Sequence, residues 1–126
     1  MKKNILRRVA IADDSPEFLA AAAEHVATLP GFMLAGTAGA ARQALALVEA
    51  VVPDVLLLDL GRAPQRSLEL VRRVKASTKP PAIVALTLFH TPETLAVARG
   101  AGADALVGKE SFVAGLGAAL ASLFPA

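Results

Sequence analysis

Residues 9–18 read VAIADDSPEF, an apolar run that ends in two acids and is followed by a helix-start signal. The run lacks polar alternation, which is typical of a strand buried on both faces in a parallel sheet between helix layers. Ser15 is a favourable N-cap, and Pro16 suits the first helical position. This stretch therefore predicts a strand and a helix joined by a short acidic turn.

The same alternation continues to the end of the chain. Further apolar runs occupy residues 33–38, 55–58, 83–86 and 105–107. Segments of helix length occupy residues 16–29, 40–51, 67–76, 92–100 and 112–124. Pro30-Gly31 ends the first helix, and Thr91-Pro92 repeats the cap signature before the fourth. The pattern predicts an α/β fold of the (βα)₅ type with right-handed crossovers, although alternation alone does not fix the strand order.

Apolar spacing also predicts which helix faces are buried. In the first helix the inner stripe is expected to be Phe18, Ala22, Val26 and Leu29. In the last helix the expected stripe is Val113, Leu116, Leu120 and Leu123.

Composition restricts the protein class. The 126 residues are 55% apolar and 19% charged, which predicts one domain over residues 1–126. The absence of cysteine excludes disulfides and zinc–thiolate sites. The apolar run after the basic start is too short for a signal peptide, and the uncharged residues 111–126 are too few for a membrane span. We therefore expect a cytoplasmic protein without membrane contact.

Charge is unevenly distributed. The net charge is +2, but residues 62–79 contain six basic residues and one acid, which leaves +5 there and −3 elsewhere. The basic residues are Arg62, Arg66, Arg72, Arg73, Lys75 and Lys79. We interpret the stretch as a solvated helix face rather than a binding patch, and we expect no nucleic acid partner for this domain.

Polar residues follow the predicted strands at one consistent place. Asp13-Asp14 follow the first strand, Asp59 the third and Thr87 the fourth, while Lys109 lies just beyond the fifth. Taken singly, Asp14 could complement a helix N-terminus and Lys109 could be a solvated loop charge. Ligands of open α/β sheets bind at the carboxyl ends of strands, and converging carboxylates need a cation. Mg²⁺, which prefers oxygen ligands, is the expected ion.

These residues give the chain a resemblance to a known family. The segments VAIADDSPEFLAAAAEHV (9–26), PDVLLLDL (53–60) and GADALVGKE (102–110) resemble the receiver domains of two-component response regulators, especially those with helix-turn-helix outputs. The resemblance covers residues 7–124. It implies a doubly wound, flavodoxin-like five-stranded parallel sheet with strand order 2-1-3-4-5.

The resemblance also implies the metal ligands. Asp14 would bind Mg²⁺ directly, and Asp13 would bind it through water. Asp59 and the backbone carbonyl of Gly61 would complete the set of protein ligands.

The signalling roles follow from the same resemblance. Asp59 would accept a phosphoryl group from a sensor histidine kinase or a small donor, Lys109 would pair with it, and Thr87 would donate its hydroxyl. Movement of Thr87 would alter the face formed by the fourth helix, fifth strand and fifth helix. That face would bind an output domain or a second copy of the chain. Such a domain is no enzyme beyond assisting its own phosphorylation and dephosphorylation.

The chain departs from the family pattern near the site. Arg62 and Arg66 flank its mouth, Leu88 stands where a small residue is usual, and Leu106 replaces the switch aromatic. These differences keep an alternative open, namely a non-phosphorylated pseudo-receiver that acts as an interaction module.

Other functions of α/β folds fit the residues less well. A phosphatase with an aspartyl nucleophile would need an acid two residues after it, where Ser15 and Gly61 stand here. Flavin or dinucleotide binding needs a phosphate-cradling first loop, which Asp13 and Asp14 would repel.

Overall fold

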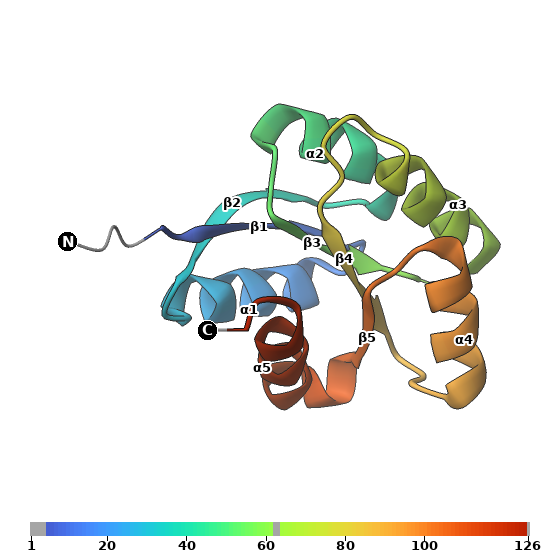
Figure 1. Cartoon of the computed structure of the whole chain (residues 1–126). Helices are drawn as coiled ribbons and strands as arrows, with labels where there is room; N and C mark the ends of the chain where they lie inside the picture. The colour runs from blue at the N-terminus through green and yellow to red at the C-terminus, as the bar shows by residue number, and fades with distance from the viewer. Residues whose placement is uncertain (1–4, 62–63, 126) are drawn as a thin grey trace.

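The computed structural model describes residues 5–61 and 64–125, and in it helices cover both faces of one sheet (Figure 1). The strands are β1 (Arg7–Ala12), β2 (Phe32–Ala38), β3 (Val55–Asp59), β4 (Ala82–Thr87) and β5 (Ala105–Gly108). The α-helices are α1 (Pro16–Thr28), α2 (Ala44–Val51), α3 (Pro64–Lys75), α4 (Pro92–Ala101) and α5 (Phe112–Leu123). Two 3₁₀ turns, η1 (Ala41–Gln43) and η2 (Lys109–Ser111), precede α2 and α5.

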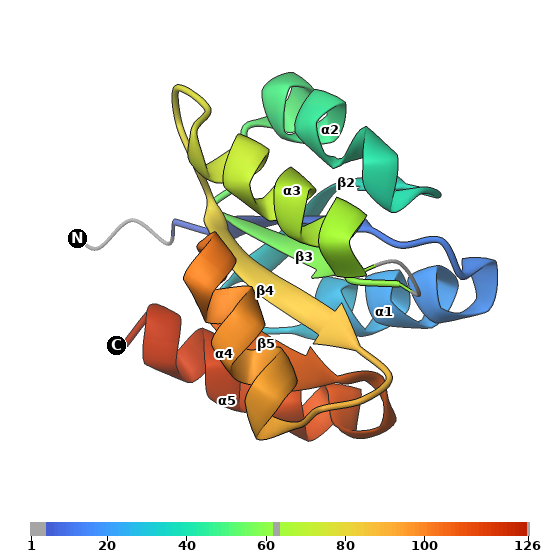
Figure 2. The same cartoon turned by 90° about the vertical axis from the view of Figure 1, so that its right-hand side faces the viewer.

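The strands pair in the order β2-β1-β3-β4-β5, and every pairing is parallel. This confirms the predicted (βα)₅ fold and its strand order. The chain crosses from one half of the sheet to the other between β1 and β3, which is where such sheets bind ligands. Figure 2 shows the arrowheads of β3, β4 and β5 pointing to the same edge.

Strand residues alternate between two cores because successive side chains point to opposite faces of a sheet. Val9 and Ile11 of β1 pack toward α1 and α5, whereas Ala10 and Ala12 pack toward α2, α3 and α4. All four residues are buried, as are all residues of β3, so the prediction of strands buried on both faces is confirmed there.

Strand β2 corrects that prediction. Six of its seven residues are only half-buried, and Thr37 is exposed. The reason is position, since β2 is an edge strand that pairs only with β1. An uncharged sequence does not distinguish an edge strand from a central one.

Helix boundaries agree with the capping signals. The Ser15 side chain accepts a hydrogen bond from the Phe18 amide, and Thr91 accepts one from the Thr94 amide. Helix α3 begins three residues earlier than predicted, at Pro64, consistent with the frequent use of proline in a first turn. The predicted second helix begins instead as the 3₁₀ turn η1.

Within the described ranges no helix is long and apolar enough to cross a membrane.

The buried face of α5 differs from the prediction. Phe112, Leu116 and Leu120 are buried at a spacing of four residues, whereas Val113 is 62% exposed. The predicted stripe was therefore wrong at Val113. Because α5 carries no charge, no polar face marks the phase of the helix in the sequence.

Most described basic residues of this stretch are exposed, as a solvated helix face requires, and Arg66 also lines the cleft beside Asp59. Arg66, Arg72 and Arg73 are exposed on α3, and Arg72 lies 3.7 Å from Glu69 in an exposed pair. Lys75 is the exception, because its Nζ lies 2.6 Å from Asp104 Oδ2 and donates to Pro81 O. Arg62 lies outside the described residues.

Leu116→Ala should lower the free energy of unfolding by about 3 kcal/mol, because it leaves a cavity at a fully buried position. Val113→Ala on the same helix is the matched control and should change it by less than about 0.5 kcal/mol. Urea denaturation measures both values. Equal losses would contradict the observed phase of α5.

Candidate functional site

The turn after β1 fixes the first two acids. The Asp13 amide donates to Ala38 O of the edge strand at 3.1 Å, and Asp13 Oδ1 accepts from the Ser15 amide at 2.8 Å. Asp13 is therefore fully buried beneath the start of α1. Asp14 is exposed, and its Oδ1 accepts a hydrogen bond of 3.2 Å from the Ala41 amide at the start of η1.

Asp59 ends β3 and is 5% exposed. Two backbone amides orient its carboxylate, since Gly61 donates to Oδ1 at 2.9 Å and Asp14 donates to Oδ2 at 3.3 Å. Gly61 has a positive φ of 62°, a conformation that strains residues with side chains. A Cβ at Gly61 would lie 3.9 Å from Asp14 Oδ2, which places this carboxylate beside the turn.

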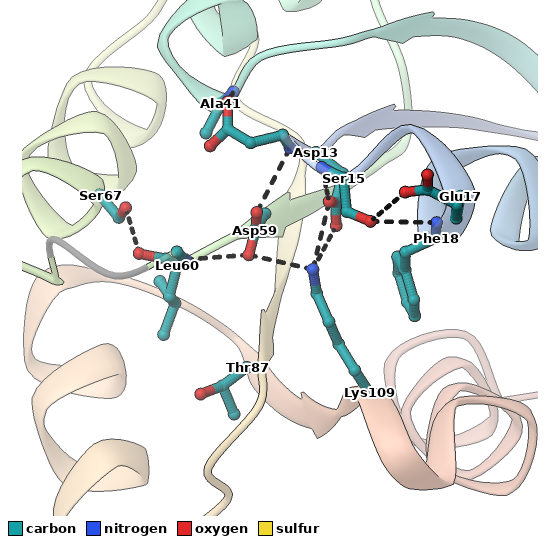
Figure 3. A network of polar contacts seen from close by, with 12 residues as sticks. Asp13, Ser15, Glu17, Phe18, Ala41, Asp59, Leu60, Ser67, Thr87 and Lys109 are labelled. Atoms are coloured by element: carbon teal, nitrogen blue, oxygen red, sulfur yellow. Dashed lines mark hydrogen bonds and ion pairs between the residues drawn. The ribbon is translucent and has the colours of Figure 1, made fainter.

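Lys109 joins the ends of three strands (Figure 3). Its Nζ lies 2.9 Å from Asp13 Oδ2 and 3.3 Å from Asp59 Oδ1, and its side chain is only 10% exposed. The ammonium also lies 4.5 Å from the centre of the Phe18 ring. Asp13 and Asp59 of the three predicted carboxylates therefore converge with Lys109, whereas the exposed Asp14 carboxylate accepts a hydrogen bond from the Ala41 amide.

Burial raises the pKa of the Asp13 carboxyl above its usual range, and the nearby negative charge of Asp59 adds to the rise. The Ser15 amide and Lys109 oppose it. Lys109 Nζ is close to Asp13 Oδ2, but that oxygen accepts no well-aligned hydrogen bond from any described residue. A buried carboxylate oxygen with spare acceptor capacity fits a hard cation as its partner.

A metal held here would need more than side chains. Across the described residues, no three acidic, histidine or cysteine side chains are grouped closely enough to hold an ion by themselves. Backbone carbonyl and water oxygens would have to complete the ligand set, which Mg²⁺ tolerates because it keeps several waters.

Thr87 lies at the end of β4 but does not join this network. Its hydroxyl accepts from the Phe89 amide at 3.1 Å and lies 3.4 Å from Phe89 O. Thr87 is 8% exposed, and both of these contacts hold its hydroxyl within its own loop. No hydrogen bond joins it to another described residue of the site.

A cleft of about 800 Å³ opens beside Asp59. Sequence reasoning missed several of its lining residues, among them Phe18, Ala41, Arg42, Ser67 and Leu70. Ser67 donates to Leu60 O at 2.6 Å and anchors α3 behind the site. A polar residue on the inner side of a helix, as at Ser67, could have been recognised in the sequence as part of the site. The Ala41 contact could not, because it is made by the backbone amide and leaves no mark on the residue type.

The departures from the family pattern occupy distinct places. Leu88 is 56% exposed and lines the cleft, together with Arg66. Leu106 is buried in the core on the α4 side, where its carbonyl lies 3.2 Å from His90 Nε2. Arg62, the other arginine expected at the mouth of the site, lies outside the described residues.

Solved structures share this fold. The receiver domain of the putative response regulator NarL from Mycobacterium tuberculosis is 23% identical with a TM-score of 0.83, covering 94% of this chain and 96% of that one. RcsB from Salmonella typhimurium is 22% identical with a TM-score of 0.81, and the match covers 96% of this chain and 60% of RcsB. At these identities the likeness concerns the fold alone.

Sequence relatives are closer in identity but longer. The chain is 37% identical over 111 residues to a protein-glutamate methylesterase/protein-glutamine glutaminase of Cereibacter sphaeroides, covering 87% of this chain and 30% of the relative. A protein of the same name from Anaeromyxobacter dehalogenans is 36% identical over 110 residues, and the match covers 87% of this chain and 32% of that relative. The chain thus spans about a third of the length of these curated relatives.

The family match covers most of the chain. The response regulator receiver domain family matches residues 9–121, which include all five strands from Val9 onward and the residues at their carboxyl ends. The resemblance predicted from the sequence is thereby confirmed, and the chain belongs to the response regulator receiver domain family.

Proposed function

We propose that this receiver domain is a phosphoacceptor whose Asp59 takes a phosphoryl group, with Mg²⁺, from a histidine kinase or a small donor. The observation that carries the proposal is the sharing of the Lys109 ammonium by Asp13 and Asp59, with Asp59 lining an open cleft. An isolated structural ion pair would not need a second carboxylate or access to solvent.

The contacts of Asp59 suit a nucleophile. The Gly61 and Asp14 amides hold its two oxygens in a fixed orientation. An Asp59 oxygen would attack phosphorus while the bond to the leaving group breaks on the opposite, solvent side. Lys109 would then stabilise the negative charge on the phosphoryl oxygens from its place beside Asp59.

Asp13, Asp14, Asp59 and the Gly61 carbonyl are the proposed Mg²⁺ ligands, with Asp14 direct and Asp13 through water. Mg²⁺ would screen the carboxylate charge and bind phosphoryl oxygens. The buried Asp13 Oδ2, which lacks an aligned donor, and the exposed Asp14 carboxylate beside Gly61 support this assignment.

The cleft suits anionic donors. Arg42 of η1 and Arg66 of α3 line it, and neither forms an ion pair with another described residue. Their positive charge would attract a phosphorylated kinase surface or a small acyl phosphate.

The proposed output is a change on the α4–β5–α5 face. Thr87 would exchange its bonds with Phe89 for a bond to the phosphoryl group and so shift the loop that carries Leu88 and Phe89. Phe89 is 74% exposed and Val97 is 52% exposed, which leaves apolar surface there for an output domain or a second copy. The chain matches only part of the methylesterase relatives, so we propose no esterase activity for it.

Asp14→Asn should weaken Mg²⁺ binding about tenfold or more, and Asp13→Asn should weaken it less, because a direct ligand contributes more than one acting through water. An amide NMR titration that follows Leu60 and Gly61 measures this. Glu17→Gln, an exposed acid on α1, is the control. If Asp14→Asn binds as tightly as the control, the metal site lies elsewhere.

Asp59→Asn should gain no phosphoryl group from acetyl phosphate and Mg²⁺, because an amide is not a nucleophile. Lys109→Ala should react about 100-fold more slowly through loss of charge stabilisation, while Lys79→Ala, at an exposed lysine, should match the wild type. Intact-protein mass spectrometry measures the label. A folded, Mg²⁺-bound wild type that takes no label would favour the pseudo-receiver instead.

Leu88→Ala should shorten the lifetime of the phosphorylated form severalfold, because the side chain lines the cleft where water must approach Asp59. Its exposure predicts a stability cost below about 1 kcal/mol. Decay of the label and urea unfolding are measured on the same variant, with Val97→Ala as an exposed control. An unchanged lifetime would rule out shielding by Leu88.

A further inference from the structure

We propose that Phe18 is a positioning residue that holds the Lys109 ammonium at the phosphorylation site. The ammonium lies 4.5 Å from the ring centre, within the range of a cation–π interaction. Figure 3 shows the ring beside the Lys109 side chain, on the side away from Thr87. The role in phosphorylation rests on the proposed function, whereas the contact itself can be tested without it.

The acidic turn that places Asp13 also places this ring. Asp13 Oδ1 accepts from the Ser15 amide, and Ser15 Oγ accepts from the Phe18 amide at 3.3 Å. Phe18 is therefore fixed in the first turn of α1, directly after the acids. The turn delivers a carboxylate and an aromatic face to the same cation.

The ring is also held from behind. Phe112 of α5, 9% exposed, meets Phe18 edge to face at a centroid distance of 5.1 Å and an angle of 77°. The His25 ring packs on Phe112 in turn, with a centroid distance of 5.9 Å. This packing restricts rotation of the Phe18 ring, so the face presented to Lys109 is fixed.

The ring differs from the other partners of Lys109 in one chemical respect. Asp13 and Asp59 carry oxygens that a divalent cation or an incoming phosphoryl group would engage, and either would weaken their hold on the ammonium. The ring competes for neither, because it has no ligand oxygen and no net charge. Phe18 can therefore keep Lys109 in place when the carboxylates are occupied.

Phe18 and Lys109 lie together between two hollows of the surface. The cleft beside Asp59 and a second hollow of about 390 Å³ between α1 and α5 are both lined by Phe18 and Lys109. Glu110 borders the second hollow and offers the ammonium a competing charge. Removing the ring would open a path for Lys109 to turn away from Asp59.

The test compares Phe18→Leu, which keeps an apolar side chain but removes the ring, with Phe18→Tyr, which keeps the ring. Phe32→Leu is the matched control, because that ring packs with Phe124 and not with Lys109. The Lys109 ε-methylene resonance is followed by NMR with and without Mg²⁺, since a ring above the ammonium shifts it upfield. We expect the shift in the wild type, Phe18→Tyr and Phe32→Leu, and its loss in Phe18→Leu.

Phosphorylation by acetyl phosphate is then measured on the same proteins. Phe18→Leu should be about threefold to tenfold slower, and Phe18→Tyr should restore the rate. In a Lys109→Ala background, Phe18→Leu should cause no further loss, because its effect acts through Lys109.

Three results would overturn the proposal: an unshifted Lys109 resonance in the wild type, no rescue by Phe18→Tyr, or an undiminished effect without Lys109. If no protein takes label, the phosphoacceptor function fails, and with it the role of Phe18 in phosphorylation. The Lys109 resonance would still decide whether the ring holds the ammonium.

Discussion

The ammonium of Lys109 lies against carboxylates from the ends of β1 and β3, and the rest of the site is arranged around that contact. Asp13 and Asp59 are almost completely buried, so their negative charges would repel each other strongly without a cation between them. The sheet order makes this contact possible because it sets β1 beside β3 and lets β5 end nearby. The strand order therefore determines which charged side chains meet at the site, namely Asp13, Asp59 and Lys109.

Much of the fold was predictable because its signals are local, and the polar edge was predictable because several such signals coincide at strand ends. Apolar runs without alternation predicted the central strands, Ser15-Pro16 and Thr91-Pro92 predicted helix starts, and acids directly after strands predicted a polar edge. The strand order came from family resemblance and not from periodicity. Where a helix or strand has no charge, as in α5 and β2, sequence does not set the phase or the place in the sheet.

The finer features of the site depend on geometry that no residue type encodes. The Ala41 and Gly61 amides contribute as backbone, so any residue except proline could have supplied the Ala41 contact. Thr87 was expected at the site and lies at the end of its strand, but its hydroxyl is bonded within its own loop. Phe18 reads in the sequence as a core aromatic, and only the packing of α1 against α5 reveals that its ring also faces a charge.

Alternating strand residues give the molecule two apolar layers that do not mix across the sheet. In β5, Leu106 belongs to the layer under α4, whereas its neighbour Val107 belongs to the layer under α5. The sheet thus lies between two separately packed apolar layers. The loop that carries Leu88 and Phe89 leads from β4 into α4, so a movement of that loop would reach the layer under α4 directly and the layer under α5 only across the sheet.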